Sequence, residues 1–453
     1  MEWDIILGYT RRVRALPRLW RSLGLAGDCI ETLSNPPTST ESIFPNLRVI
    51  GLHDPSTTIT PLVRHFLNPE LTEIWFERME NLGTAIEGFG EECPLVTDFC
   101  VSEWAHADTI SGLICRWENL CSVKCYSVGL NIDSLSHLSR LRNMHYLSFK
   151  VDDAVVDRIS ATQSFSSTLA FSALRDLYIA ADSLTPIWRF FHHVRIPVIR
   201  DLSVTLHVHA RPTAPDLMSF FVAIQQTCVH HDSLNEFSLW VYHNQNESDA
   251  TALADVSSYY ITVDRLRPLT VFANIKSVRL DIPCGADLNE RELLCLASSW
   301  PHLERFEVGK NYDWTPSSAL TPGGFLQLLE RCRSLRVLYF MFDARGYTEI
   351  PQGHPWRGLS MPNNAFLHFL NSPIEEESIK ALGVFFHVAP YPDFNLSTHW
   401  NYRFYPGGGR PQELCELYYN RWVEARSLAR NLWEERGNLR RSLEGQSGRR
   451  DSQ

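Results

Sequence analysis

A short apolar pattern occurs twelve times along this chain of 453 residues, and no other feature restricts its fold as strongly. Each copy reads apolar, two residues, apolar, one residue, apolar, as in Leu47-Ile50-Leu52. The first five copies begin 24 or 25 residues apart, and later intervals reach 44 residues. The other copies are Leu71-Ile74-Phe76, Val96-Phe99-Val101, Leu120-Val123-Cys125, Met144-Leu147-Phe149, Leu174-Leu177-Ile179, Ile199-Leu202-Val204, Leu234-Phe237-Leu239, Ile275-Val278-Leu280, Leu303-Phe306-Val308, Leu335-Leu338-Phe340 and Ile379-Leu382-Val384.

The spacing of this pattern predicts a strand followed by a helix in every repeat. The last two apolar positions alternate, so they point to one face of a short strand. Segments 60–67, 106–116, 289–299 and 324–332 have apolar residues at three- and four-residue steps, which is typical of helices. A strand and a helix in about 20–29 residues form a leucine-rich repeat. The prediction is an α/β fold, a leucine-rich-repeat-like right-handed solenoid with a curved parallel sheet of about twelve strands and helices on the convex side.

Composition shifts at both ends predict four regions. Residues 1–43 are expected to form an N-terminal helical cap and connector, with Asn35-Pro36-Pro37 breaking any further helix. The solenoid is expected over 44–389, and a capping segment with a helix over 390–435. The basic tail 436–453 is expected to be disordered.

Charge and composition exclude several classes of partner. The net charge of −10 leaves no basic face for nucleic acid, and no apolar run reaches the roughly 18 residues of a membrane helix. The 11 cysteines follow no export signal, so we expect reduced thiols and a cytoplasmic or nuclear location.

Motifs for catalysis and for cofactors are absent from the sequence. Gly407-Gly408-Gly409 lacks the lysine of a phosphate loop, and neither a Gly-x-Ser-x-Gly nor a His-Glu-x-x-His motif occurs. Cys115, Cys121 and Cys125 cluster, but Cys125 points inward on a strand and Cys121 does not, so zinc is disfavoured. We therefore expect no enzyme, no cofactor and no metal.

Two further cysteines have a packing explanation. Cys93 and Cys332 precede strands at the place that Trp117 and Trp300 take in other repeats. A metal ligand cannot alternate with tryptophan, so this position is predicted to fill the core.

The residue before the second apolar position of each copy is predicted to face the concave surface. Five of these twelve residues are acidic, including Asp176, Asp201 and Glu236, and equivalent positions lie about 4.8 Å apart in adjacent strands. Two interpretations are open: neighbouring arginines neutralise the acids, or the acids and nearby aromatics form a groove for a basic protein segment. The expected contact residues are Asp176, Tyr178, Asp201, Glu236, Trp240, Arg279 and Asp281. The insertions at 209–230 and 241–271 are expected to fold over this groove.

Three segments resemble a known family. Residues 324–340, GFLQLLERCRSLRVLYF, look like the cysteine-containing repeat of F-box proteins, and Tyr9–Leu16 and Glu416–Trp422 are similar to flanking segments of that group. The chain thus resembles fungal F-box/leucine-rich-repeat-like proteins of the basidiomycete type. This resemblance implies the substrate-binding repeat region of an F-box-type ubiquitin-ligase receptor.

A scaffold for protein–protein interaction without a ubiquitin-ligase role is the alternative. An F-box needs about 40 residues, whereas 12 residues precede Val13, so no F-box is expected in the sequence as given. Binding of the cullin-ligase adaptor is therefore expected only if an F-box is supplied elsewhere.

Overall fold

The chain forms two compact units in a computed structural model. One unit comprises Met1–His207 with Val222–Ser233, and the other comprises Val208–Phe221 with Leu234–Gln453. The structure describes residues 2–17, 31, 34–35, 42–53, 63–77, 86–102, 107–162, 168–207, 212–241, 260–282, 286–309, 320–349, 356, 359, 365–370, 372–388, 395–398 and 412–450.

The described part of the first unit contains eight consecutive parallel strands. Their order is β1-β2-β3-β4-β5-β6-β8-β10, and a short pair, β7 with β9, lies outside this sheet. The strands are β1 (Ala15–Pro17), β2 (Val49–His53), β3 (Glu73–Glu77), β4 (Asp98–Ser102), β5 (Ser122–Gly129), β6 (Tyr146–Lys150), β7 (Leu169–Ala170), β8 (Asp176–Ala181), β9 (Val194–Arg195) and β10 (Asp201–Leu206).

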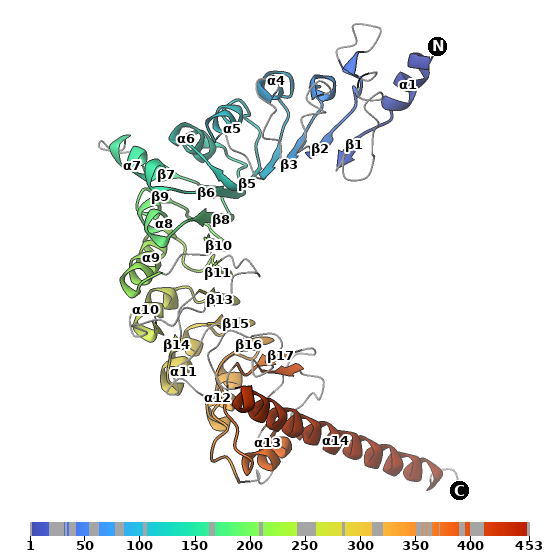
Figure 1. Ribbon diagram of the computed structural model, residues 1–453, viewed down its shortest axis with the longest axis vertical. Helices are drawn as coiled ribbons and strands as arrows, with labels where there is room; N and C mark the ends of the chain where they lie inside the picture. Colours follow the sequence, from blue (N-terminus) through green and yellow to red (C-terminus); the bar gives the residue numbers. More distant parts are fainter. Residues whose placement is uncertain are drawn as a thin grey trace. The chain divides into compact units, whose positions relative to one another are not determined.

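Helices cover one face of this sheet (Figure 1). They are α1 (Glu2–Thr10), the 3-10 turn η1 (Arg64–Phe66), α4 (Glu87–Glu92), α5 (Ala107–Ile114), α6 (Ile132–Arg140), α7 (Asp153–Thr162) and α8 (Leu184–Phe191). Between helices and strands lies an apolar core in which Phe99, Trp117 and Phe149 are at most 1% exposed. The open face of the first unit is defined here as the outward side chains of these strands, on the face that the helices leave uncovered.

In its described residues, the second unit repeats the arrangement with six parallel strands in the order β11-β13-β15-β16-β17-β18, and a separate pair, β12 with β14. The strands are β11 (Glu236–Val241), β12 (Ile261–Thr262), β13 (Ser277–Asp281), β14 (Ala286–Asp287), β15 (Arg305–Val308), β16 (Val337–Tyr339), β17 (Phe366–His368) and β18 (Asn395–Ser397). Helix α9 (Ala214–Thr227) is divided between the two units.

The remaining helices of the second unit include a long C-terminal one. They are α10 (Val263–Leu266), the 3-10 turn η4 (Arg267–Val271), α11 (Glu290–Ser299), α12 (Pro322–Arg331), α13 (Ser378–His387) and α14 (Gln412–Arg450). Asn289 begins α11 with a capping box: its side chain accepts from the backbone N–H of Glu292, and the Glu292 carboxylate accepts from that of Asn289. Gly383 of α13 lies against α14, where an added Cβ would meet the Leu428 side chain at 2.6 Å.

Eleven of the twelve predicted strands are present, and the twelfth is wrong. Ile379-Leu382-Val384 lies in helix α13, while β17 supplies the next strand from residues that the pattern did not mark. The spacing of Ile379, Leu382 and Phe386 also matches the 3.6-residue period, and all three are buried in the helix.

Both ends of the chain differ from expectation. Strands β1 and β18 lie outside the range 44–389 expected for the solenoid, and β1 pairs in parallel with β2. Helix α14 continues to Arg450, so residues 436–450 are helical where disorder was predicted. The parallel strands and covering helices establish an α/β solenoid of the leucine-rich-repeat type.

The prediction for the helix-end cysteines and tryptophans is confirmed. Cys93, Trp300 and Cys332 are the C-cap residues of α4, α11 and α12, and all are at most 1% exposed. Trp117 is equally buried, and its indole donates to the Phe89 carbonyl at 3.4 Å.

Candidate functional site

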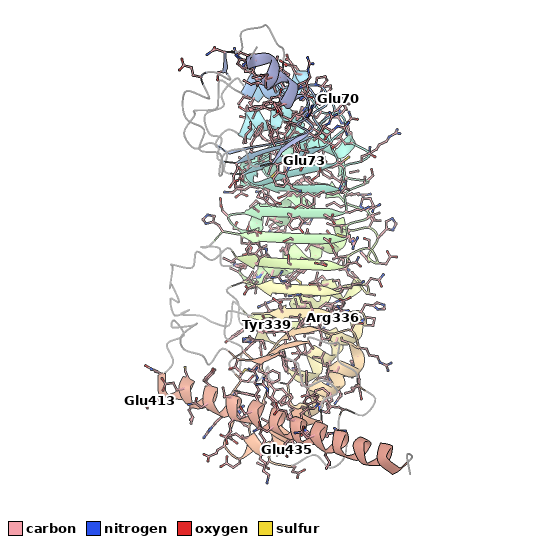
Figure 2. The ribbon with its side chains drawn as sticks, turned by 90° about the vertical axis from the view of Figure 1, so that its right-hand side faces the viewer. Glu70, Glu73, Arg336, Tyr339, Glu413 and Glu435 are labelled. Atoms are coloured by element: carbon pink, nitrogen blue, oxygen red, sulfur yellow. The ribbon has the colours of Figure 1, made fainter. Side chains whose placement is uncertain are left out.

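Strand register aligns the outward side chains of the first unit in columns. One column runs Glu73, Asp98, Ser122, Tyr146, Asp176 and Asp201, and the column two residues later runs Trp75, Cys100, Lys124, Ser148, Tyr178 and Ser203. Figure 2 faces the strands, with Glu73 labelled among the side chains that project from them. Adjacent members of a column lie about 4.8 Å apart, close enough for side chains to interact across strands.

An aromatic–lysine cluster lies at the centre of this open face; it comprises Trp75, Lys124, Tyr126, Tyr146 and Tyr178. The Lys124 Nζ lies 5.6 Å from the Trp75 ring centroid and 5.3 Å from that of Tyr146. Both distances are within the range of a cation–π interaction. The Tyr146 and Tyr178 rings stack at 5.2 Å, and the hydroxyls of Tyr126 and Tyr146 lie 3.3 Å apart.

Three carboxylates near this cluster have no cationic partner within the described part of the chain. Among the described residues, no lysine or arginine lies within ion-pair distance of Glu73, Asp98 or Asp176. Glu73 instead accepts the indole N–H of Trp75 at 2.5 Å, and Asp98 accepts the Thr97 hydroxyl at 2.8 Å. Direct pairing with an arginine, which would support the first of the two open interpretations, is thus not seen at these three acids in the described part of the chain.

Burial changes the acidity of two groups in this region. Burial raises the pKa of Tyr146, and the hydrogen bond with Tyr126 acts in the same direction. Burial also raises the pKa of Cys100 to about 11, against an opposing effect of the Lys124 charge. Both groups are therefore protonated near neutral pH, so Tyr146 presents a neutral ring and Cys100 is not a thiolate nucleophile.

The open face of the second unit has a different composition. Glu307 is 2% exposed; its carboxylate lies 2.7 Å from Arg305 Nη1 and 3.6 Å from Arg279 Nε. The Tyr339 ring stacks on the His368 ring at 4.9 Å, and Tyr339 is labelled in Figure 2. A buried carboxylate between two arginines fixes the orientation of guanidinium groups that are themselves partly exposed.

The seven sequence-predicted contact residues divide between the two units. Asp176, Tyr178 and Asp201 lie on the open face of the first unit, where Asp201 of β10 is in register with Asp176 of β8. Glu236, Trp240, Arg279 and Asp281 lie on β11 and β13 of the second unit, where Trp240 pairs with Asp281. The structure thus brings together members of each group.

The first of the two insertions expected to fold over the groove forms a helix that packs on the core. Residues 214–227 form helix α9, in which Phe220 and Phe221 are buried against Phe237. This segment therefore packs on the core instead of folding over the strands. Residues 242–259 of the second insertion lie outside the described residues.

Sequence reasoning missed Lys124, the central residue of the cluster. Only the first outward column was interpreted systematically, and Lys124 belongs to the second. A systematic interpretation of the second column would have placed it two strands from Trp75, at a distance that a lysine side chain can span.

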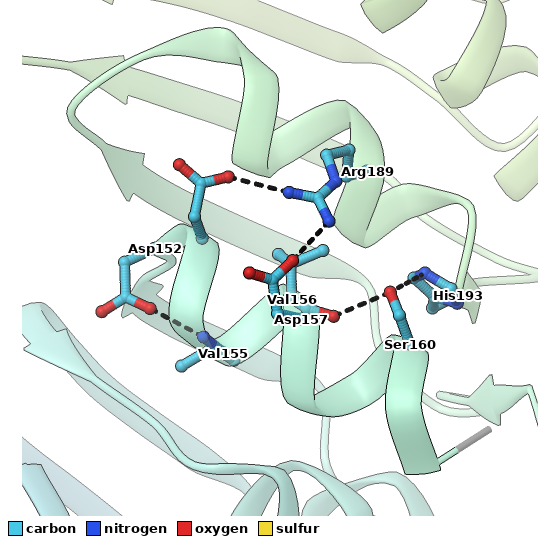
Figure 3. Close-up of polar contacts among 8 residues, drawn as sticks. Asp152, Val155, Val156, Asp157, Ser160, Arg189 and His193 are labelled. Atoms are coloured by element: carbon cyan, nitrogen blue, oxygen red, sulfur yellow. Dashed lines mark hydrogen bonds and ion pairs between the residues drawn. The ribbon is translucent and has the colours of Figure 1, made fainter. Parts of the chain in front are cut away.

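Polar groups on the helical side have structural roles. Arg189 of α8 donates to Asp157 at 2.6 Å and to Asp153 at 3.0 Å, which joins α8 to α7 (Figure 3). Ser160 lies 2.9 Å from His193 Nε2, but its hydroxyl donates to the Val156 carbonyl. The Ser160 hydroxyl thus contacts the Val156 carbonyl of its own helix and the His193 ring of the segment after α8, and it links the two.

The described ranges offer neither a metal-binding group nor, beneath α11, a polar pocket. No three histidine, cysteine, aspartate or glutamate side chains there are grouped as metal ligands require. A small cavity beneath α11 is lined by apolar side chains, including Trp300, Phe306 and Leu328, and offers no polar group for chemistry. None of the described helices combines the length and apolarity needed to cross a bilayer.

Comparisons with known proteins show only distant likeness. No protein-family model matches the sequence, and no curated protein matches it. An internalin from Listeria monocytogenes is 14% identical, with 88% of this chain and 87% of that chain covered and a TM-score of 0.37. Rad7 in its yeast complex with Elc1 is 13% identical (74% and 77% covered, TM-score 0.30), and LegL7 of Legionella pneumophila is 10% identical (63% and 97% covered, TM-score 0.30). The fold assignment rests on the strand register.

Proposed function

We propose that this chain is a non-catalytic protein-recognition module that binds a partner through the open faces of its sheets. The observation that supports it most is the aromatic–lysine cluster, in which Trp75 is 42% and Tyr126 46% exposed. The carboxylates around it have no cationic partner among the described residues. Exposed aromatic residues beside charged groups that can complement those of a partner are typical of protein interfaces.

The proposed contact residues include those predicted from the sequence: Asp176, Tyr178, Asp201, Glu236, Trp240, Arg279 and Asp281. Tyrosine, tryptophan and arginine are the residue types enriched at binding hot spots. Trp240 is 38% exposed, and the Arg279 side chain is 52% exposed and held by Glu307. Charge reversal at Asp201 and Glu236 is expected to weaken partner binding and to reduce its salt dependence.

A more specific proposal is the substrate-binding region of an F-box-type ubiquitin-ligase receptor. Its support is the resemblance of residues 324–340 to the repeats of that group. The alternative is a scaffold without a ubiquitin-ligase role, which the same surfaces support equally. Co-purification separates the two: cullin and its adaptor accompany a receptor and are absent from a scaffold complex.

The face assignment is tested by quantitative affinity capture with the full chain. The variant Asp98→Lys/Asp176→Lys reverses two open-face charges, and Glu92→Lys/Glu118→Lys makes the same change at exposed positions outside that face. We expect partners captured by the unaltered chain to be depleted by the first variant and retained by the second. Equal retention by both variants would reject the open face of the first unit as the binding surface.

A further inference from the structure

The ammonium group of Lys124 is held between aromatic rings and not by a carboxylate. Its Nζ lies 5.6 Å from the Trp75 centroid and 5.3 Å from the Tyr146 centroid, and it makes no ion pair with any described residue. Lysine near an acidic surface ordinarily pairs with a carboxylate, as Lys150 does with Asp182 at 3.0 Å. We call the position between the Trp75 and Tyr146 rings the cleft; it holds a cation supplied by the protein itself.

The two walls of this cleft are positioned by their neighbours. The Trp75 indole donates to Glu73, and Tyr146 stacks on Tyr178 and contacts the Tyr126 hydroxyl. Each wall is therefore oriented without help from Lys124. Removal of the lysine side chain is therefore expected to leave both rings in place and the cleft between them empty.

The charge around the cleft selects a cation over an anion. Glu73, Asp98 and Asp176 have no cationic partner among the described residues, and Lys124 is the cation nearest the rings. An arginine fits this setting best, because its planar guanidinium stacks on aromatic faces and also donates several hydrogen bonds to carboxylates.

We infer that the cleft between Trp75 and Tyr146 receives an arginine side chain of a protein partner, and that Lys124 occupies it in the free protein as an internal competitor. This inference rests on the proposed function, since it names the chemistry of the segment bound there. Binding requires Lys124 to withdraw, so the intact lysine lowers the affinity for every arginine-containing segment.

The test measures fluorescence anisotropy of labelled nine-residue Gly/Ser peptides containing three arginines, three lysines or three citrullines, titrated with the full chain. Citrulline keeps the shape of arginine without its charge. Lys124→Ala is compared with Lys150→Ala, which removes the same charge from the same face outside the cleft. Circular dichroism verifies that each variant is folded.

We expect Lys124→Ala to bind the arginine peptide about fivefold more tightly than Lys150→Ala does. Trp75→Ala combined with Lys124→Ala is expected to abolish this gain, and the citrulline peptide to show none. Equal effects of the two lysine variants would overturn the inference, as would weaker binding by Lys124→Ala or an equal gain for the lysine peptide. Partner capture that still depends on Asp98 and Asp176 would then leave the proposed function intact.

Discussion

Trp422 is predicted to be the main anchor of helix α14. It is 2% exposed, and its indole N–H donates to the Ser372 carbonyl at 2.9 Å. Its ring lies 5.1 Å from that of Phe369 and 6.1 Å from that of Phe342. Substitution by alanine therefore removes the ring that joins the helix to the end of the second unit's core.

The expected loss in the free energy of unfolding has two parts. Truncation of a buried tryptophan to alanine costs about 3–5 kcal/mol through lost burial and the cavity left behind. The Ser372 carbonyl loses its donor in a buried setting, and an unpaired buried polar group costs about 1–3 kcal/mol unless water reaches it. Trp422→Phe keeps most of the ring packing, so it is expected to show mainly this second cost.

Urea unfolding followed by circular dichroism measures these losses, with Trp433→Ala as the control on the same helix. Trp433 is 41% exposed, so its truncation is expected to change the free energy of unfolding by less than about 0.5 kcal/mol. Limited proteolysis supplies a second readout, because undocked α14 is cleaved faster. Equal destabilisation by Trp422→Ala and Trp433→Ala would refute the anchoring role.

Three other predictions concern capping, pH and thiol reactivity. Asn289→Ala removes the capping box of α11 and is expected to cost about 1 kcal/mol in urea unfolding; an unchanged midpoint contradicts this. Burial lowers the pKa of His65 below its unfolded value, so the free energy of unfolding is highest above about pH 6.5 and falls on acidification. The variant His65→Gln is expected to show a weaker dependence of the free energy of unfolding on pH. Burial raises the pKa of Cys93 and Cys228 to about 12, so mass spectrometry after iodoacetamide treatment of the folded protein is expected to find exposed Cys295 alkylated and both buried thiols intact.

The fold was predictable wherever burial imposed the strand pattern. Ile50, Ile74 and Phe99 are at most 1% exposed at equivalent inward positions. These positions require apolar residues, and the requirement is visible in the sequence as the repeated pattern. The pattern failed at Ile379-Leu382-Val384 because apolar residues three apart suit a helix as well as a strand start. It missed Phe366–His368 because Asn364 stands where the pattern requires its first apolar residue, although Leu367 and Phe369 fill the other two positions.

The chemistry of the open face was predictable only in part. Alternation placed Asp176 and Asp201 correctly in one column, since a strand permits only two directions for its side chains. The contact of Lys124 with Trp75 depends on how far two long side chains lean across the strand between them. The helical tail shows the opposite failure, because charge density alone suggested disorder although its arginine, glutamate and leucine residues favour helix.

Separation of inward and outward positions has a consequence for evolution and for engineering. In β3 to β6 the inward side chains support the fold, while the outward ones contact neighbours mainly along their own columns. A new specificity is thus accessible through single outward substitutions, each altering one point of a regularly spaced surface at little cost to folding. Such a chain is a natural template for libraries in which outward positions vary and the apolar framework is held constant.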